Sequence, residues 1–152
     1  MRPFVFLGLL LAVAPVAAQR RPPVVVVMPF DRATDTTPAI AATLADSLEA
    51  RLRARRGLRV AHHPLPAGTP WQADTVGAAN YLVGATMIWL RGTLRVDLQL
   101  FGLLDERPLW SATYRVASVP ELFALADSMT AQVASVVLVD HRQRAPQSRP
   151  AN

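Results

Sequence analysis

Residues Leu94 to Leu100 read LRVDLQL, and this alternation of apolar and polar side chains decides the fold. Leucine and valine occupy every second position, with arginine, aspartate and glutamine between them. Because successive side chains of a strand point to opposite faces, one face of this segment meets a core and the other meets water or a partner. The sequence therefore predicts a strand over Thr93 to Phe101 in an antiparallel sheet.

Two further strand candidates flank this segment. Tyr81 to Leu90 precedes it, and Leu109 to Val116 follows with a similar alternation. Arg91-Gly92 is a tight hairpin connection, and Asp105 to Pro108 is a second short turn. The three segments therefore predict an antiparallel meander.

Upstream of the meander the pattern is that of a strand followed by a helix. Val24 to Met28 is a continuous apolar run before Pro29, which is typical of a central strand covered on both faces. A helix is expected to start at Pro38 and to end at Gly57, with an apolar stripe at every fourth residue. That stripe consists of Ile40, Leu44, Leu48 and Leu52. A short strand at Leu58 to Ala61 and one or two helical turns within Ala73 to Ala79 follow.

A second long helix is expected after the meander. Ser118-Val119-Pro120-Glu121 is a capping box with proline in the first turn. The apolar stripe that follows has helical spacing, and it must be buried against the sheet. It consists of Leu122, Leu125, Met129, Val133, Val136 and Val137.

Together these elements predict one α/β domain over residues 22–139. Its order is β-α-β-(short α)-β-β-β-α, a mixed sheet with a three-stranded antiparallel meander and two long helices packed on it. Residues 140–152, which are rich in Arg, Gln and Pro, are expected to form a disordered tail. A chain of 152 residues is too short for two good cores.

The first eighteen residues have the pattern of a secretion signal. Met1-Arg2 supplies a positive start, Phe4 to Val13 is an apolar run, and Val16-Ala17-Ala18 offers small residues for cleavage after Ala18. A membrane anchor is the alternative, but the run is shorter than the roughly 20 residues that a span needs. We therefore expect an exported protein, periplasmic or secreted, with no stable membrane insertion after cleavage.

Composition and charge exclude several classes of protein. The chain has no cysteine, so disulfides, thiolate catalysis and lipidated cysteine are absent. The net charge of +5 comes from the signal and the termini, because residues 22–139 hold ten arginines and ten acids. A neutral core excludes nucleic-acid binding as its function.

The ordered segments resemble the amino-terminal domain of TolB and the related FlgO-like small envelope domains. The matching pieces are VVVVMPF at Val24 to Phe30, LADSLEARL at Leu44 to Leu52, GLRV at Gly57 to Val60, NYLVGAT at Asn80 to Thr86, LRVDLQLFGLL at Leu94 to Leu104, PLWSATY at Pro108 to Tyr114 and ELFALADSM at Glu121 to Met129. The resemblance implies a non-catalytic envelope module that binds other proteins. It implies no catalytic motif.

Residues with chemical potential form no recognisable site in the sequence. His62 and His63 are adjacent in an extended loop, so they point apart and do not readily chelate one metal ion. No serine stands in a GxSxG or SxxK pattern. Asp31 and Asp35 are interpreted as loop-shaping residues, and Asp105-Glu106 as a solvated turn. No cofactor is implied.

The candidate partner-binding residues are Arg51, Arg55 and Trp71. Arg51 and Arg55 are expected on one face at the end of the first helix, where compensation of the helix dipole is the simpler interpretation and docking of an acidic partner the alternative. Trp71, in a Pro-rich loop, either anchors a partner or pins that loop to the core.

The leading hypothesis is a module that docks to or regulates an envelope protein. A small envelope hydrolase with a site at the sheet edge is the runner-up, and it requires His62 or His63 to meet a serine and a carboxylate. A third possibility is a binder of anionic membrane surfaces through Arg20, Arg21 and the tail.

Overall fold

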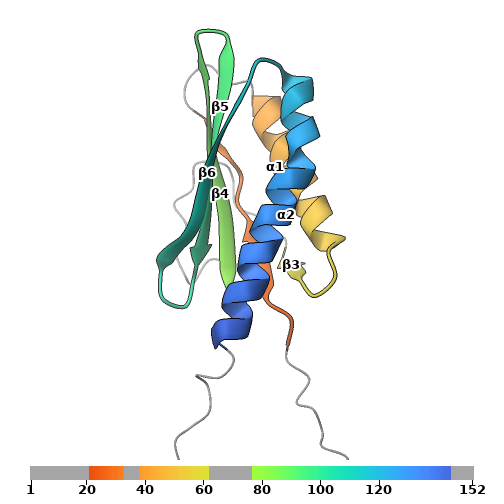
Figure 1. Cartoon of the computed structure of the whole chain (residues 1–152), viewed down its shortest axis with the longest axis vertical. Coiled ribbons are helices and arrows are strands. Elements are labelled where there is room, and N and C mark those ends of the chain that lie inside the picture. Colours follow the sequence, from red (N-terminus) through yellow and green to blue (C-terminus); the bar gives the residue numbers. More distant parts are fainter. Residues whose placement is uncertain (1–20, 33–37, 62–76, 145–152) are drawn as a thin grey trace, which may run out of the picture.

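The computed structural model describes residues 21–32, 38–61 and 77–144. Their elements follow one another in the order expected for an α/β domain (Figure 1). They are β1 (Val24–Val27), β2 (Asp31–Arg32), α1 (Pro38–Arg53), β3 (Arg59–Ala61), β4 (Tyr81–Leu90), β5 (Thr93–Gly102), β6 (Arg107–Val116) and α2 (Val119–Arg144).

The strands form one mixed sheet in the order β3-β1-β4-β5-β6. β1 pairs in parallel with β3 and β4, whereas β4, β5 and β6 form the predicted antiparallel meander. The sequence pattern missed β2, whose residues were expected in a loop. This two-residue strand pairs with Thr86 and Met87 of β4 and continues the line of β1 after Pro29, which has no N–H to donate.

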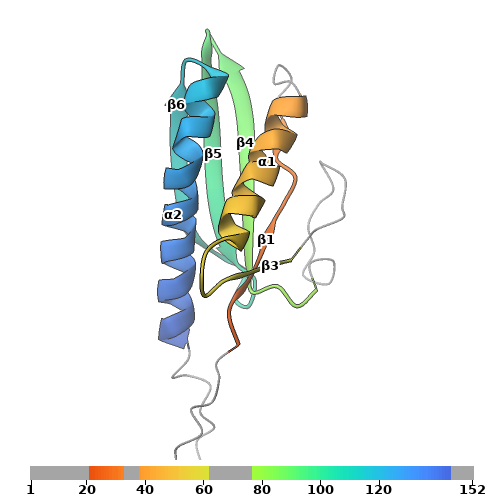
Figure 2. The same cartoon turned by 90° about the vertical axis from the view of Figure 1, so that its right-hand side faces the viewer.

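Both helices cover the same face of the sheet, with α2 over β5 and β6 and α1 over β1 and β4 (Figures 1 and 2). The main core lies in this layer, where the four apolar residues of the middle strand, Leu94, Val96, Leu98 and Leu100, are fully buried. A smaller cluster of Val26, Met28 and Leu82 is buried on the opposite face. β1 is therefore covered on both faces, as its continuous apolar run predicted.

Several element ends differ from the prediction: β1 ends at Val27, β3 starts at Arg59 and β5 ends at Gly102, each one residue away from the expected bound. α1 ends at Arg53 rather than Gly57, because its last turn tightens: the amide of Arg55 bonds the carbonyl of Leu52, three residues back. β6 starts at Arg107, so that Pro108 lies in the strand and the turn consists of residues 103–106.

The final helix continues past the boundary that was expected at Val139. α2 runs to Arg144, and Asp140, placed by the sequence in a disordered tail, is only 7% exposed. The physical reason is that Asp140 lies on the buried side of the helix, where it accepts hydrogen bonds from Tyr81 and Arg107. Residues 145–152 of that tail lie outside the described residues, as do the signal segment and residues 73–76 of the expected short helix.

Among the described helices, α2 has the length and hydropathy of a membrane span. A core helix has the same character. In this fold the buried residues of α2 include Leu122, Met129, Val133 and Val137, which belong to the main core. The hydropathy of α2 is therefore explained by its packing on the sheet.

Candidate functional site

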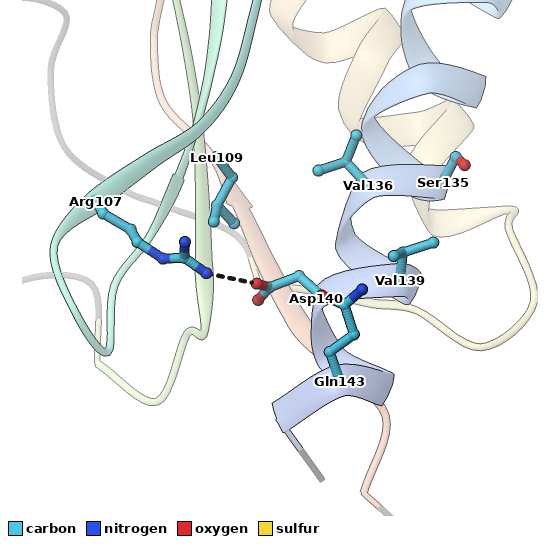
Figure 3. A pocket seen from close by; sticks show the side chains of 7 residues that line it. All are labelled: Arg107, Leu109, Ser135, Val136, Val139, Asp140 and Gln143. Carbon is cyan, nitrogen blue, oxygen red and sulfur yellow. Dashed lines mark hydrogen bonds and ion pairs between the residues drawn. The ribbon is translucent and has the colours of Figure 1, made fainter. Parts of the chain in front are cut away.

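An open hollow of about 320 Å³ lies between the edge strand β6 and the C-terminal half of α2 (Figure 3). We name it the β6–α2 hollow. Its walls come from residues of the two elements: Arg107, Leu109, Ser135, Val136, Val139, Asp140 and Gln143.

Local structure explains why these side chains converge. The residues from α2 are spaced at intervals of one, three and four, so they share one side of the helix. Leu109 lies across from them at the register shift between β5 and β6, where the extra residue of a bulge locally disrupts the pairing of the two strands. Leu109 and Val136 are half-buried and Val139 is 41% exposed, so the apolar part of the hollow faces outward.

A charged cluster closes one end of the hollow around Asp140. The hydroxyl of Tyr81 donates to Oδ2 of Asp140 at 2.9 Å, and Nη2 of Arg107 donates to Oδ1 at 3.1 Å. Arg144, one helical turn after Asp140, donates to the same carboxylate. The cluster thereby joins β4, β6 and α2.

Asp105 adds a second carboxylate to this charged cluster. Nη2 of Arg144 lies 3.1 and 3.2 Å from its two carboxylate oxygens, and Arg107 forms an ion pair with it. Asp105, Arg107, Asp140 and Arg144 thus alternate in sign and balance to neutrality. Asp105-Glu106 was predicted to be a solvated turn. Both residues are exposed, but the ion pair between Asp105 and Arg144 also holds that turn against α2.

The ionisation of the cluster follows from these contacts. Burial, strengthened by the hydrogen bond to Asp140, raises the pKa of Tyr81 well above its ordinary value. Desolvation works to raise the pKa of Asp105, but the hydrogen bonds and charges of Arg144 and Arg107 outweigh it and lower that pKa below 3.8. Hydrogen bonding to Asp140 raises the pKa of Arg144. Asp105 and Arg144 are therefore charged near neutral pH, and the phenol of Tyr81 is neutral.

Gly102 permits the close approach on which the cluster depends. A Cβ at this position would lie 3.0 Å from Oδ1 of Asp105 and 3.1 Å from Nη2 of Arg144. Both atoms are side-chain ends that pair with each other, so a side chain at position 102 would displace this ion pair by a few tenths of an ångström. Glycine leaves the ion pair undisturbed.

The arrangement is suited to binding rather than to proton transfer. Ser135 lines the hollow, but the carboxylate of Asp140 already accepts hydrogen bonds from Tyr81, Arg107 and Arg144. A carboxylate held in this way is a poor general base. His62 and His63, which the hydrolase alternative requires, lie outside the described residues. Within residues 21–32, 38–61 and 77–144, no three His, Asp or Glu side chains gather to hold a metal ion.

Comparison with known proteins places the fold. No model of a protein family matches the sequence, and no curated protein matches it. Among solved structures, the hypothetical protein CT253 from Chlamydia trachomatis superposes with a TM-score of 0.60 at 14% identity, over 77% of this chain and 98% of that one. TolB from Acinetobacter baumannii gives 0.51 at 18% identity, over 86% of this chain but only 30% of TolB.

The chain has a TolB-like fold. The C-terminal domain of LpoB from Escherichia coli shares it, with a TM-score of 0.52 at 13% identity over 64% of this chain and 84% of that domain. Identities of this size concern the fold alone.

On this TolB-like fold the predicted binding residues do not come together at the hollow. Nε of Arg51 lies 3.3 Å from Oδ1 of Asp127, which links α1 to α2, although the two groups are not aligned for a hydrogen bond. Arg55 is exposed in the turn after α1, not on the helix, so the expected shared helical face does not exist. Trp71 lies outside the described residues.

Sequence reasoning missed the cluster because its members are far apart in the chain. Tyr81 and Asp140 are separated by 59 residues, and Asp105 and Arg144 by 39. One local signal was present: Asp140 and Arg144 have the spacing of a helical ion pair, and they continue the buried stripe through Val133 and Val137. That signal predicts a longer helix but does not identify the partners across the fold.

Proposed function

We propose that this chain is a non-catalytic, exported protein-interaction module of the bacterial cell envelope, which docks to or regulates an envelope protein. The observation that carries the proposal is the β6–α2 hollow, in which an outward-facing apolar wall of Leu109, Val136 and Val139 lies beside a neutral cluster whose acids and bases are already paired. Such a surface fits a protein partner, because an exposed apolar wall gains from burial while paired charges define its rim.

Two other observations support the location and the family. The first eighteen residues have the pattern of a cleaved signal, which favours a periplasmic or secreted protein. The TolB-like fold agrees with the order of sequence segments that resembles the TolB amino-terminal domain. We therefore propose membership of that group of small envelope domains and its FlgO-like neighbours, whose implied role is to bind other proteins without catalysis.

Arg51 and Arg55 remain a proposed second contact. Arg55 is exposed, and Arg51 is half-buried and partly compensated by Asp127, whose side chain is 78% exposed. Among the described residues Arg55 has no ion pair, so an acidic partner would meet this guanidinium beside one that is already engaged. The hollow combines an apolar wall with paired charges, whereas the arginine pair offers charge alone, and we rank the hollow first.

The experiment is capture of partners from the native envelope by the mature protein and three variants. Val139→Glu places a charge in the wall of the hollow at a position exposed enough to keep the fold. Arg51→Glu/Arg55→Glu reverses the arginine pair, and Asp46→Lys changes an exposed position on α1 as the matched control.

Loss of a captured protein with Val139→Glu, but not with Asp46→Lys, is the expected result. If a captured protein were lost only with Arg51→Glu/Arg55→Glu, the docking site would lie at the arginine pair and not at the hollow. A capture pattern identical for all four proteins would contradict docking through either surface.

A further inference from the structure

The sheet ends at β6, and the free edge of this strand lies beside the hollow. β6 pairs with β5 on one side, and no strand in the described part of the chain pairs with its other side. It is ten residues long, whereas β3 at the opposite edge has three. A long edge presents unpaired backbone groups that another extended segment can use.

The hairpin register identifies these groups. A two-residue loop, Arg91-Gly92, with φ of 50° and 80°, joins β4 to β5, so the flanking residues Leu90 and Thr93 form a hydrogen-bonded pair. Hydrogen bonding alternates from there, and the even-numbered residues from Leu94 to Leu100 direct their backbone groups toward β6. The backbone groups of Ser111, Thr113 and Arg115 consequently point to the open edge.

The open part of the edge has defined limits. Pro108 has no N–H, and the register shift at Leu100/Phe101 twists that end of β6. Val116 ends the strand on the other side. An added strand therefore pairs over Ser111 to Arg115, and its extension past Ser111 passes the β6–α2 hollow, whose nearest wall is Leu109.

Charge favours an acidic occupant. Arg115 lies opposite Arg95 in the β5–β6 register. Arg95 is paired with Asp97 at 2.9 Å, and the hydroxyl of Thr113 also donates to Asp97. In the described part of the chain Arg115 has no ion pair of its own. Asp97 attracts Arg115 through its charge but forms its ion pair with Arg95. An acidic side chain beside Arg115 would therefore give this arginine an ion-pair partner of its own.

The segments on either side of the described domain do not have this charge. Residues 1–30 and 141–152 contain no acid, and β6 carries two arginines and no acid. A second copy pairing edge to edge would bring a second Arg115 and no acid from β6, because Arg107 of each copy is already paired with Asp105 and Asp140. Charge complementarity thus points to another molecule.

We propose that an extended acidic segment of an envelope protein adds to β6 over Ser111 to Arg115 as an extra strand and places an apolar side chain in the β6–α2 hollow. Hydrogen bonds between the backbone of the added strand and that of β6 supply the affinity. Arg115 and the hollow determine which sequences of the bound segment are preferred. This inference rests on the proposed function and specifies its binding mode.

The test selects a phage-displayed library of random linear dodecapeptides on the mature protein. Selected peptides are expected to contain Asp or Glu and an apolar residue and to lack Pro in the paired segment. Amide hydrogen exchange with the tightest peptide, made synthetically, is then expected to slow at Ser111, Thr113 and Arg115 and to change little at Ala112 and Tyr114, which already bond β5. This alternation is specific to an added strand.

Two variants and one control separate the contribution of the Arg115 charge to peptide affinity from that of the backbone hydrogen bonds. Arg115→Glu is expected to weaken the acidic peptide about fivefold or more and to favour basic peptides in a new selection. Thr113→Pro, which removes one outward N–H, is expected to weaken it about tenfold. Arg59→Glu makes the same charge change on the exposed edge strand β3 and is expected to leave the affinity within twofold.

Each contrary result overturns the inference. Protection outside β6, unchanged affinity of Arg115→Glu, pairing of two copies through β6, or failure to select any peptide contradicts strand addition. If strand addition is contradicted but Val139→Glu abolishes capture from the envelope, docking through the hollow stands and only the binding mode is wrong. If strand addition is contradicted and Val139→Glu leaves capture unchanged, the proposed function is wrong as well.

Discussion

At the scale of single residues, Asp140 links the last helix, α2, to strands β4 and β6 of the sheet. It is nearly buried and accepts hydrogen bonds from a tyrosine of β4, an arginine of β6 and an arginine of its own helix. A buried carboxylate is favourable only while its donors remain in place. Removing it leaves Arg107 and Arg144 with fewer partners and Tyr81 with an unpaired hydroxyl.

Asp140→Ala is therefore expected to lower the free energy of unfolding by about 3 kcal/mol, measured by urea denaturation. Asp127→Ala is the matched control, since this aspartate on the same helix also pairs with an arginine but has a side chain that is 78% exposed. Its expected loss is about 0.5 kcal/mol or less. Equal losses for the two variants would show that the cluster contributes no more than a surface ion pair.

Tyr81 provides a prediction about pH. Burial and the hydrogen bond to Asp140 raise the pKa of Tyr81, and burial raises that of Tyr114. The folded protein therefore keeps both phenols protonated around pH 10, where unfolded tyrosines are half ionised. Since the unfolded chain releases these protons first, stability is complete below this pH and falls as the pH rises above it.

Near-ultraviolet absorbance of the Tyr114→Phe variant measures this effect on Tyr81 alone, because the chain has two tyrosines. At pH 10 little tyrosinate is expected in the folded variant, and about half ionisation after unfolding in urea. Half ionisation in the folded state would contradict the buried hydrogen bond.

At the scale of elements, the sequence patterns predicted the bounds of some elements better than others. β4 has the predicted bounds, because the hairpin loop and the period-two alternation act locally. The first turn of α2 is held by the predicted capping box, with the amide of Glu121 donating to Oγ of Ser118 at 3.4 Å and Glu121 accepting from the amide of Ala117.

The end of α2 was not predicted, and the reason is physical. Asp140 to Arg144 are polar, and polarity at a chain end is typical of a disordered tail. Their order depends on Tyr81, Asp105 and Arg107, whose proximity comes from the folded sheet. The candidate site was missed for the same reason, because Leu109 and Val139 line one hollow from two different elements and no local pattern relates them.

Truncation tests the corrected boundary. A chain of residues 22–144 is expected to unfold with nearly the same midpoint as residues 22–152, whereas residues 22–139 lose Asp140 and Arg144 and are expected to be about 3 kcal/mol less stable. Urea denaturation followed by circular dichroism compares the three. Equal midpoints for 22–139 and 22–144 would return the domain boundary to Val139.

At the scale of the whole molecule, most of the architecture was predictable, because apolar stripes of two helices and one alternating strand leave few ways to form a core. The helices cover one face of the sheet, as predicted (Figure 2). What the sequence did not contain is the position of the hollow, which arises where the edge strand and the longer helix meet. The proposed docking surface is thus a property of the assembled fold.

Site-specific photocrosslinking tests the central claim most directly. A benzoylphenylalanine in place of Ser135, in the wall of the hollow, is compared in the native envelope with one in place of Ala42, an exposed residue of α1. Docking through the β6–α2 hollow predicts a discrete crosslinked protein from position 135 and none from position 42. Crosslinking from position 42 with none from position 135 would contradict it.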